Sequence, residues 1–193
     1  MTEPTLDASK TALVVIDLQR NIVEYPTAPH PAAAVVQRSA GLLAAARRAG
    51  ILPILVHVGG APDHADRLLQ SADRPTPPRP GSSDFTPEIA PQDGDVVIFK
   101  RQWGAFYGTD LDLQLRRRRI DTLILCGIAT ERGVESTARD AYERNYRQFL
   151  VEDAMSGLDE LSHRNAIERT FPRIGHVRRT DQMLAMMAPP TQP

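Results

Sequence analysis

The chain has 193 residues, of which 41% are hydrophobic and 24% charged, and this length predicts one domain, 1–193, with a sizeable core. Its net charge of −1 gives no overall field for nucleic acid or an anionic membrane, and no apolar run is long enough to span a membrane. The start of the chain has no apolar signal core, and the single cysteine, Cys126, cannot form an intramolecular disulfide, so we expect a cytoplasmic protein.

Apolar runs alternate with helical patterns along the chain. A strand at 11–17 precedes a helix at 31–50, a strand at 51–58 and, after a long connection, a strand at 95–100. A helix at 109–119, a strand at 121–127, a helix at 131–146 and a strand at 147–153 follow. The chain continues with a helix at 156–171, a short strand at 176–180 and a helix at 181–188. This alternation predicts an α/β fold with a parallel sheet covered by helices on both faces.

Turn and capping residues mark the expected ends of several helices. Gly50 is expected to end the first helix. Capping boxes are expected at the starts of two others, from Thr109 with Asp112 and from Ser156 with Asp159.

The segment 71–94 interrupts the alternation. It is rich in proline and too long for an ordinary connection. We expect a lid over a site or an arm that grips another subunit, in preference to a merely solvated loop.

Polar residues stand where the predicted strands end. In parallel sheets, ligands bind beyond the carboxyl ends of the strands. Asp17, His57, Lys100 and Asp153 end the first, second, third and fifth strands, and the turn 127–133 follows the fourth. We therefore expect these residues to line one edge of the sheet.

Asp17 and Lys100 are the two charged residues best suited to chemistry at this edge. Partial burial would raise the pKa of the Asp17 carboxyl and suit it to proton transfer, although an Asp can also simply cap a loop. Lys100 could pair with Asp17 or hold an anion. A surface charge is the alternative, but 21 of the 23 basic residues are arginines, so a lysine here is less expected by chance.

The turn "GIATERGVESTA" (127–138) offers backbone groups rather than a side chain. A helix that starts near Glu131 would direct free N–H groups to the edge of the sheet, where they can bind an anion or oxyanion. Gly133 in the first turn suggests a need for space or a close backbone approach.

Taken together, these residues resemble the isochorismatase-like hydrolase superfamily, which includes cysteine amidohydrolases. The matching stretches are "ALVVIDLQRNIV" (12–23), the segment 96–146 and "FLVEDAMSG" (149–157). The resemblance implies a three-layer fold with a six-stranded, mostly parallel sheet, assembled as a dimer or tetramer. It also implies a catalytic triad in which Asp17 and Lys100 are two members and Gly133 stands at the position of the nucleophilic cysteine.

The same resemblance implies a cis peptide bond between Ile128 and Ala129, and an oxyanion hole formed by N–H groups near Ala129 and Gly133. Without a thiol at the turn, the acyl-enzyme route is closed. Cys126 lies seven residues earlier and is expected in the core, and neither Thr130 nor Ser136 occupies the turn position.

Isochorismatases also lack the thiol, because they hydrolyse a vinyl ether by protonation from the Asp. That chemistry fits Asp17, Lys100 and Gly133, although Ile16 stands where isochorismatases usually have a His. Two hypotheses therefore remain open: a cysteine-independent hydrolase of a small molecule, and a catalytically silent relative that binds a ligand or has a structural role.

Further residues are expected to contact the small-molecule substrate, and no cofactor, metal or nucleic acid is expected. The substrate-binding candidates are Gln19, Trp103, Phe106, Tyr107, Ala129 and Thr130, with the three aromatic residues forming an apolar wall. The segment 62–66 is interpreted as a solvated turn rather than a metal site. Glu131 and Arg132 could face either the pocket or solvent, and the run Arg116–Arg119 is expected to be an exposed helix end.

Overall fold

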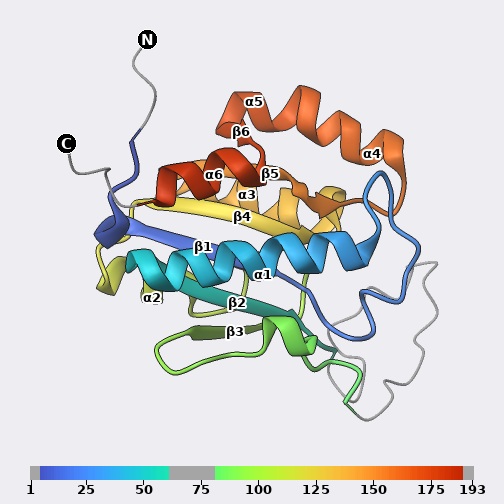
Figure 1. Ribbon diagram of the computed structural model, residues 1–193, viewed down its shortest axis with the longest axis horizontal. Helices are drawn as coiled ribbons and strands as arrows, with labels where there is room; N and C mark the ends of the chain where they lie inside the picture. The colour runs from blue at the N-terminus through green and yellow to red at the C-terminus, as the bar shows by residue number, and fades with distance from the viewer. Residues whose placement is uncertain (1–4, 61–80, 189–193) are drawn as a thin grey trace.

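A computed structural model describes residues 5–60 and 81–188, which form a six-stranded sheet in the order β3-β2-β1-β4-β5-β6 (Figure 1). All five neighbouring pairs are parallel. The strands are β1 (Thr11–Ile16), β2 (Leu52–Val58), β3 (Val96–Lys100), β4 (Thr122–Ile128), β5 (Arg147–Ser156) and β6 (His176–Arg178). This confirms the predicted α/β class. The strand order reverses between β1 and β4, so the connections that leave these two central strands run in opposite directions. Parallel sheets of this kind bind ligands at the carboxyl ends of the strands where the order reverses.

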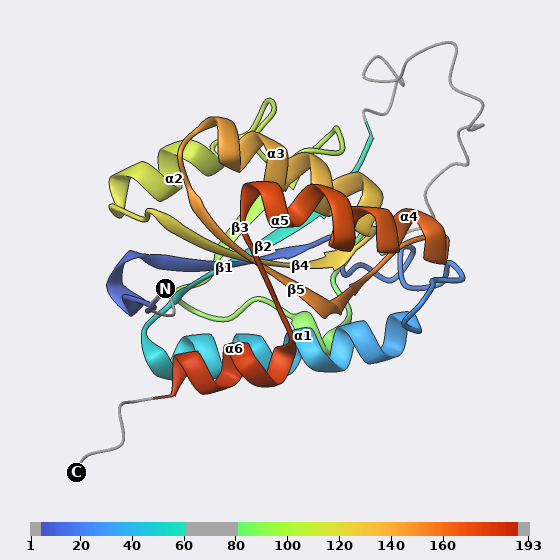
Figure 2. The same cartoon turned by 90° about the horizontal axis from the view of Figure 1, so that it is seen from above.

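Helices cover both faces of the sheet, giving three layers (Figure 2). One face carries α1 (Ala32–Ala49) and α6 (Thr180–Met187), and the other carries α2 (Leu111–Arg117), α3 (Glu135–Glu143), α4 (Glu160–Asn165) and α5 (Phe171–Ile174). None of the helices in the described ranges is long and apolar enough to cross a membrane.

Two apolar clusters fill the spaces between the layers, because successive strand residues point to opposite faces. On the α1 and α6 side, the core includes Leu13, Val15 and Cys126. On the α2 and α3 side, it includes Val14 and Ile16. Successive side chains of β4 therefore pack alternately into one cluster and the other.

Several helix and strand ends differ from the sequence prediction. Gly50 ends α1 in the left-handed conformation, with φ of 73°, as expected. The fifth strand continues to Ser156, so Asp153 lies inside β5 rather than at its end. Both predicted capping boxes are wrong. Thr109 accepts a hydrogen bond from the Leu111 N–H, only two residues on, and Asp112 accepts one from a tyrosine hydroxyl instead.

The second box fails because Ser156 is still part of β5. Asp159 is itself the N-cap of α4 and accepts a hydrogen bond from the Ser162 N–H at 2.8 Å. The helix predicted at 131–146 is also divided. It begins as a wider, π-helical turn at Thr130–Val134, continues as α3 and ends at Glu143.

Gly127 allows β4 to approach β1 closely. Its φ of 125° is a conformation that residues with a side chain rarely adopt, and a Cβ atom there would overlap the carbonyl oxygen of Ile16. The turn that follows β4 is therefore held directly against the end of β1.

Only part of the proline-rich segment 71–94 can be placed, because residues 71–80 lie outside the described residues. The described part packs against its own chain. The Thr86 N–H donates to the Leu18 carbonyl at 3.0 Å, and Ile89 is fully buried in the core beneath α1. Whether the segment acts as a lid or a subunit arm stays a prediction.

Candidate active site

The carboxyl ends of β1, β3 and β4 bring a carboxylate, an ammonium group and a turn together. Lys100 ends β3, and its Nζ lies 2.7 Å from Oδ2 of Asp17, which follows β1. The same ammonium group donates to the Gln102 carbonyl at 3.1 Å. Since β2 lies between β3 and β1, the long side chain of Lys100 reaches across the end of β2. Both residues are buried, with 1% of Lys100 and 5% of Asp17 exposed.

Asp17 is held in a strained conformation with one carboxylate oxygen unused. Its φ is 54°, in the left-handed region, and its N–H donates to the Val56 carbonyl at 2.9 Å. Within the described residues, Oδ1 is buried and has no hydrogen-bond partner. Burial raises the pKa of Asp17 to about 6, although the Lys100 ammonium opposes this rise. A carboxyl group with such a pKa can hold or donate a proton near neutral pH.

Gly133 lies directly opposite the carboxylate of Asp17. A Cβ atom at Gly133 would stand 3.1 Å from Oδ2 of Asp17 and 2.9 Å from Cγ2 of Ile16. The Thr137 hydroxyl donates to the Gly133 carbonyl at 2.7 Å and accepts from the Ala105 N–H at 3.0 Å. One side chain thus fixes both this turn and the loop that follows Lys100.

The turn after β4 is rigidly held by its own backbone. The Ile128–Ala129 peptide bond is cis, as the resemblance implied. The Ala129 carbonyl accepts hydrogen bonds from the Arg132 and Val134 N–H groups at 3.1 and 3.3 Å. Ala129 is buried, with 8% of it exposed, and belongs to the core cluster beneath α1.

Thr130 is hydrogen-bonded to a histidine that sequence reasoning missed. Its hydroxyl oxygen lies 2.8 Å from Nδ1 of His163, and both residues are buried. Burial, followed by the nearby His30, lowers the pKa of His163 to about 4. The imidazole is therefore neutral at neutral pH. His163 belongs to α4, and nothing in its local sequence pattern separates it from an ordinary helical residue.

The aromatic residues after Lys100 do not form one wall. Trp103 and Tyr107 are 57% and 70% exposed, and they line a shallow depression together with Gln102 and Gly104. Phe106 is buried instead. Its ring packs 5.9 Å from that of Tyr146, and so it contributes to the core under α2 and α3.

Gln19 is buried, and its amide is used by backbone groups. Its Nε2 donates to the Val58 and Ser83 carbonyls at 2.9 and 3.0 Å, and its Oε1 accepts from the Val58 N–H at 2.7 Å. In this arrangement Gln19 joins the end of β2 to the described part of the proline-rich segment.

Two other strand residues have surroundings of their own. Asp153 accepts hydrogen bonds from the N–H and hydroxyl of Thr180, at 2.7 and 2.9 Å, and pairs with Arg38 of α1. The expectation that it would join Asp17 at the end of its strand is therefore wrong, because β5 runs three residues further. His57 packs between Phe85 and Phe99, and burial lowers its pKa.

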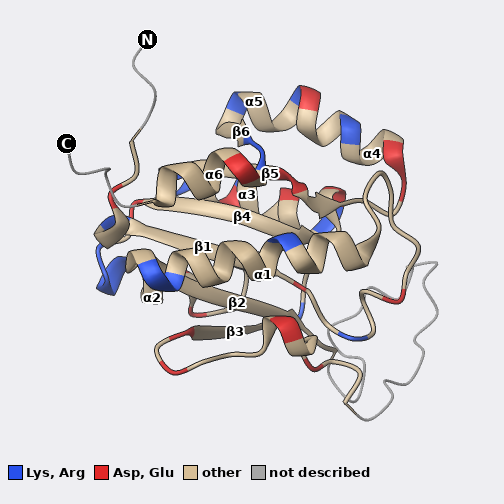
Figure 3. Ribbon diagram, in the orientation of Figure 1, with Lys and Arg blue, Asp and Glu red and all other residues tan. Residues whose placement is uncertain are grey.

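In the described ranges, charged and metal-ligating side chains do not form a second reactive centre. Acidic and basic residues are dispersed over the ribbon, and Arg116–Arg119 form an exposed basic end of α2 (Figure 3). No group of three His, Cys, Asp or Glu side chains among residues 5–60 and 81–188 could hold a metal ion. The segment 62–66, interpreted from sequence as a solvated turn, lies outside the described residues.

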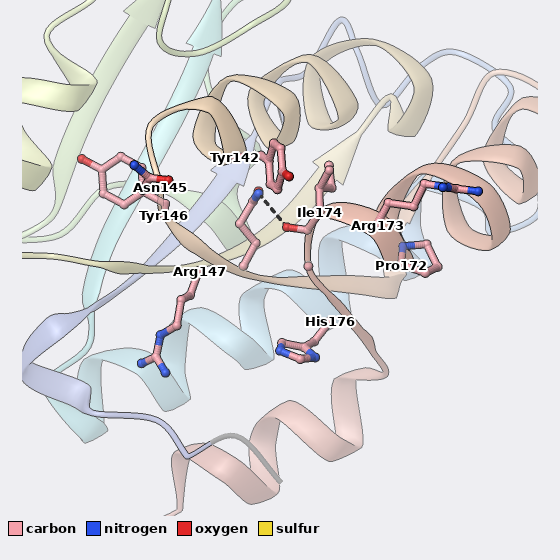
Figure 4. A pocket seen from close by; sticks show the side chains of 10 residues that line it. Tyr142, Asn145, Tyr146, Arg147, Pro172, Arg173, Ile174 and His176 are labelled. Atoms are coloured by element: carbon pink, nitrogen blue, oxygen red, sulfur yellow. Dashed lines mark hydrogen bonds between the residues drawn. The ribbon is translucent and has the colours of Figure 1, made fainter. Parts of the chain in front are cut away.

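A second hollow lies at the opposite edge of the sheet (Figure 4). Its lining residues precede or begin β5 and β6, so it faces the amino ends of these strands. Arg147 and Arg173 extend away from each other rather than converging on a common point (Figure 4). The hollow therefore offers no focused binding group, and the carboxyl edge is the better candidate.

Several known proteins are similar to this chain in fold and in sequence. The sequence profile of the Isochorismatase domain matches residues 11–182. The chain belongs to the isochorismatase family. It is 46% identical to the isochorismatase family protein YecD of Escherichia coli O157:H7, over 93% of this chain and 97% of YecD.

Two solved structures extend the comparison. An isochorismatase family protein from Burkholderia thailandensis is 43% identical, with a TM-score of 0.88 over 96% of this chain and 99% of that one. N-carbamoylsarcosine amidase from Thermoplasma acidophilum is 31% identical, with a TM-score of 0.73 over 89% of this chain and 97% of that one. The chain is thus similar to isochorismatase-family hydrolases over nearly its whole described length.

Proposed function

We propose that this isochorismatase-family protein hydrolyses a small molecule without a cysteine nucleophile, with Asp17 as the acid. The observation that carries the proposal is the buried pair of Asp17 and Lys100, whose carboxylate faces Gly133 and has one oxygen without a partner among the described residues. Burial of a carboxyl group is unfavourable, and the fold alone does not require one at this position. A role in proton transfer accounts for its presence.

Gly133 is proposed to occupy the position of the family's nucleophile. Cys126 is a poor substitute, because it is fully buried on the face of the sheet that α1 covers, whereas Gly133 adjoins the cluster on the other face. Burial also raises the pKa of the Cys126 thiol to about 12, so almost none of it is thiolate at neutral pH. Thr130 is also unsuited, since its hydroxyl is already hydrogen-bonded to His163.

Hydrolysis of an enol ether is the reaction that these groups support best. The Asp17 carboxyl gives its proton to the terminal carbon of the double bond, and the ether oxygen stabilises the resulting cation. Water adds to the cationic carbon and returns a proton to the Asp17 carboxylate. The hemiketal then divides into an alcohol and a ketone, so that one water is consumed and Asp17 ends protonated.

Lys100 and the turn have supporting roles in this scheme. The Lys100 ammonium lowers the pKa of Asp17 and so keeps its carboxylate accessible as a proton acceptor after the first step. The backbone N–H groups near Ala129 and Gly133 are proposed to bind an oxygen of the substrate. The absence of a side chain at Gly133 leaves the space for it.

The test is the release of pyruvate from isochorismate by the wild-type protein and by Asp17→Asn. We expect release by the wild type and a loss of at least about 100-fold in the variant, which is the usual contribution of a positioned acid. Asp121→Asn, at the exposed amino end of β4, is the matched control and should keep full activity. Turnover that survives in a folded Asp17→Asn variant would exclude Asp17 as the acid.

The competing hypothesis is a catalytically silent protein that retains the pocket. It predicts no turnover by the wild type on isochorismate or on other small enol ethers and amides. In that case a ligand found by screening should bind Asp17→Asn and the wild type with similar affinity.

A further inference from the structure

Glu131 and Arg132 leave the active-site turn in different directions, which the sequence could not decide. Oε1 of Glu131 accepts a hydrogen bond from the Leu158 N–H at 3.1 Å, so this carboxylate turns toward the segment before α4. The Arg132 guanidinium instead lies over the indole ring of Trp103, 5.5 Å from the ring centroid. Arg132 is thus a partly exposed cation next to Gly133 in the turn.

The carboxylates near Arg132 are engaged elsewhere. Glu135 pairs with Arg139 at 2.7 Å, and Asp140 pairs with Arg144 at 3.1 Å. Asp17 pairs with Lys100, and Glu131 is turned to a backbone N–H. Over the part of the chain that the structure describes, Arg132 makes a ring contact with Trp103 and no ion pair. Its charge and its hydrogen-bond donors are therefore available to an external anion.

The Arg132–Trp103 pair is oriented for a planar anion. The guanidinium lies over the indole ring, and its planar N–H edges match the two oxygens of a carboxylate. Trp103 is 57% exposed and lines the depression with Gln102, Gly104 and Tyr107. Its carbonyl oxygen would lie 3.6 Å from a Cβ atom at Gly133, so the pair adjoins the proposed reaction site.

We propose that Arg132 and Trp103 form a subsite that anchors a carboxylate of the substrate beside the proposed reaction site. Arg132 binds the carboxylate, and Trp103 and Tyr107 provide aromatic surface for the adjoining carbon skeleton. The reacting bond then lies between this anchor and Asp17. This role of the subsite rests on the proposed function, but the binding it predicts needs no turnover.

Trp103 makes the test direct, because it is the only tryptophan in the chain and its fluorescence reports on this subsite. The probes are benzoate and its neutral analogue benzamide, titrated against the wild type and followed by both Trp103 fluorescence and calorimetry. We expect saturable binding of benzoate that weakens as salt is added, and binding of benzamide that is weaker by about 10-fold.

Three variants locate the charge responsible. Arg132→Gln should weaken benzoate binding by about 10-fold and leave benzamide unchanged, whereas Arg132→Lys should recover only part of the loss, since lysine lacks the planar edge. Arg169→Gln, an exposed arginine beyond α4, is the matched control and should bind as the wild type does. Equal binding of benzoate and benzamide, no saturable binding of benzoate, or no effect of Arg132→Gln would overturn the subsite.

The result remains separate from the test of Asp17. Asp17→Asn should bind benzoate with nearly wild-type affinity. If Arg132→Gln loses benzoate while Asp17→Asn keeps turnover, the carboxylate subsite stands and the role of Asp17 as the acid fails. If Asp17→Asn loses turnover while Arg132→Gln binds benzoate normally, the acid stands and the subsite fails.

Discussion

The imidazole of His163 and the hydroxyl of Thr130 form a buried hydrogen bond of 2.8 Å that ties α4 to the turn after β4. His163 belongs to a helix 33 residues further along the chain, yet it contacts the turn that carries Gly133. Protonation of His163 would therefore alter a hydrogen bond that holds the turn from outside it.

Acid should destabilise the protein through His163. Its folded-state pKa of about 4 lies below the ordinary value of 6.5, so the unfolded chain takes up the proton first as the pH falls. The stabilisation is complete above pH 6.5 and is lost as the pH falls toward 4, by up to about 3 kcal/mol. The free energy of unfolding, measured with urea across this range, should fall less steeply in His163→Asn than in the wild type. An exposed control, His176→Gln, should keep the wild-type slope.

Turnover should decline as the pH rises through the pKa of Asp17. The acid step needs the protonated carboxyl, which predominates below pH 6 and falls about 10-fold for each further pH unit. The rate of pyruvate release against pH is the measurement. Because Lys100 lowers the pKa of Asp17, Lys100→Met should move the decline to higher pH. A rate that rises with pH across this region would contradict the assignment of Asp17 as the acid.

A methyl group at Gly133 should be costly, although alanine normally favours helices. The added Cβ would stand 2.9 Å from Cγ2 of Ile16, a branched side chain fixed inside β1. We expect Gly133→Ala to lower the free energy of unfolding by about 1–3 kcal/mol and to reduce turnover. Gly41→Ala is the matched control. Its added methyl meets no atom within 4 Å, so it should stabilise α1 by about 0.5–1 kcal/mol. Equal stabilisation of both variants would show that the turn can accommodate a methyl group at position 133.

Cys126 should be chemically silent in the folded protein. Its thiol is fully buried, and its sulfur accepts a hydrogen bond from the Ser39 hydroxyl at 3.5 Å. A thiol reagent such as DTNB should therefore react only as the protein unfolds, at a rate that follows the unfolding rate. Cys126→Ala should lose about 1 kcal/mol of stability and no turnover. A folded Cys126→Ala variant without activity would make this thiol the reacting group.

The sheet could be predicted from sequence because its strands are short, nearly all-apolar runs between helical patterns. The rule that ligands bind beyond the carboxyl ends of parallel strands then placed Asp17 and Lys100 at one edge of the sheet. It failed for Asp153, since the apolar run of β5 resumes after this residue with Ala154 and Met155. Neither the length of that strand nor its contact with Arg38 is visible in local periodicity.

Contacts between distant segments account for the remaining differences. Phe106 stands in the same aromatic stretch as Trp103, and only packing against Tyr146 separates a core ring from an exposed one. His163 and the divergence of Glu131 from Arg132 depend on where α4 and the loop after β3 meet the turn. The spacing of residues along the sequence does not reveal these contacts.

The scarcity of lysine has a practical consequence for handling this protein. Of the two lysines, Lys100 is 1% exposed and bound to Asp17, whereas the Lys10 side chain is 54% exposed just before β1, at the amino edge of the sheet. Lysine-directed coupling should therefore spare the Asp17–Lys100 pair and attach the molecule through Lys10. A surface coated through Lys10 would present the carboxyl edge of the sheet, with the proposed substrate site, outward to the solution.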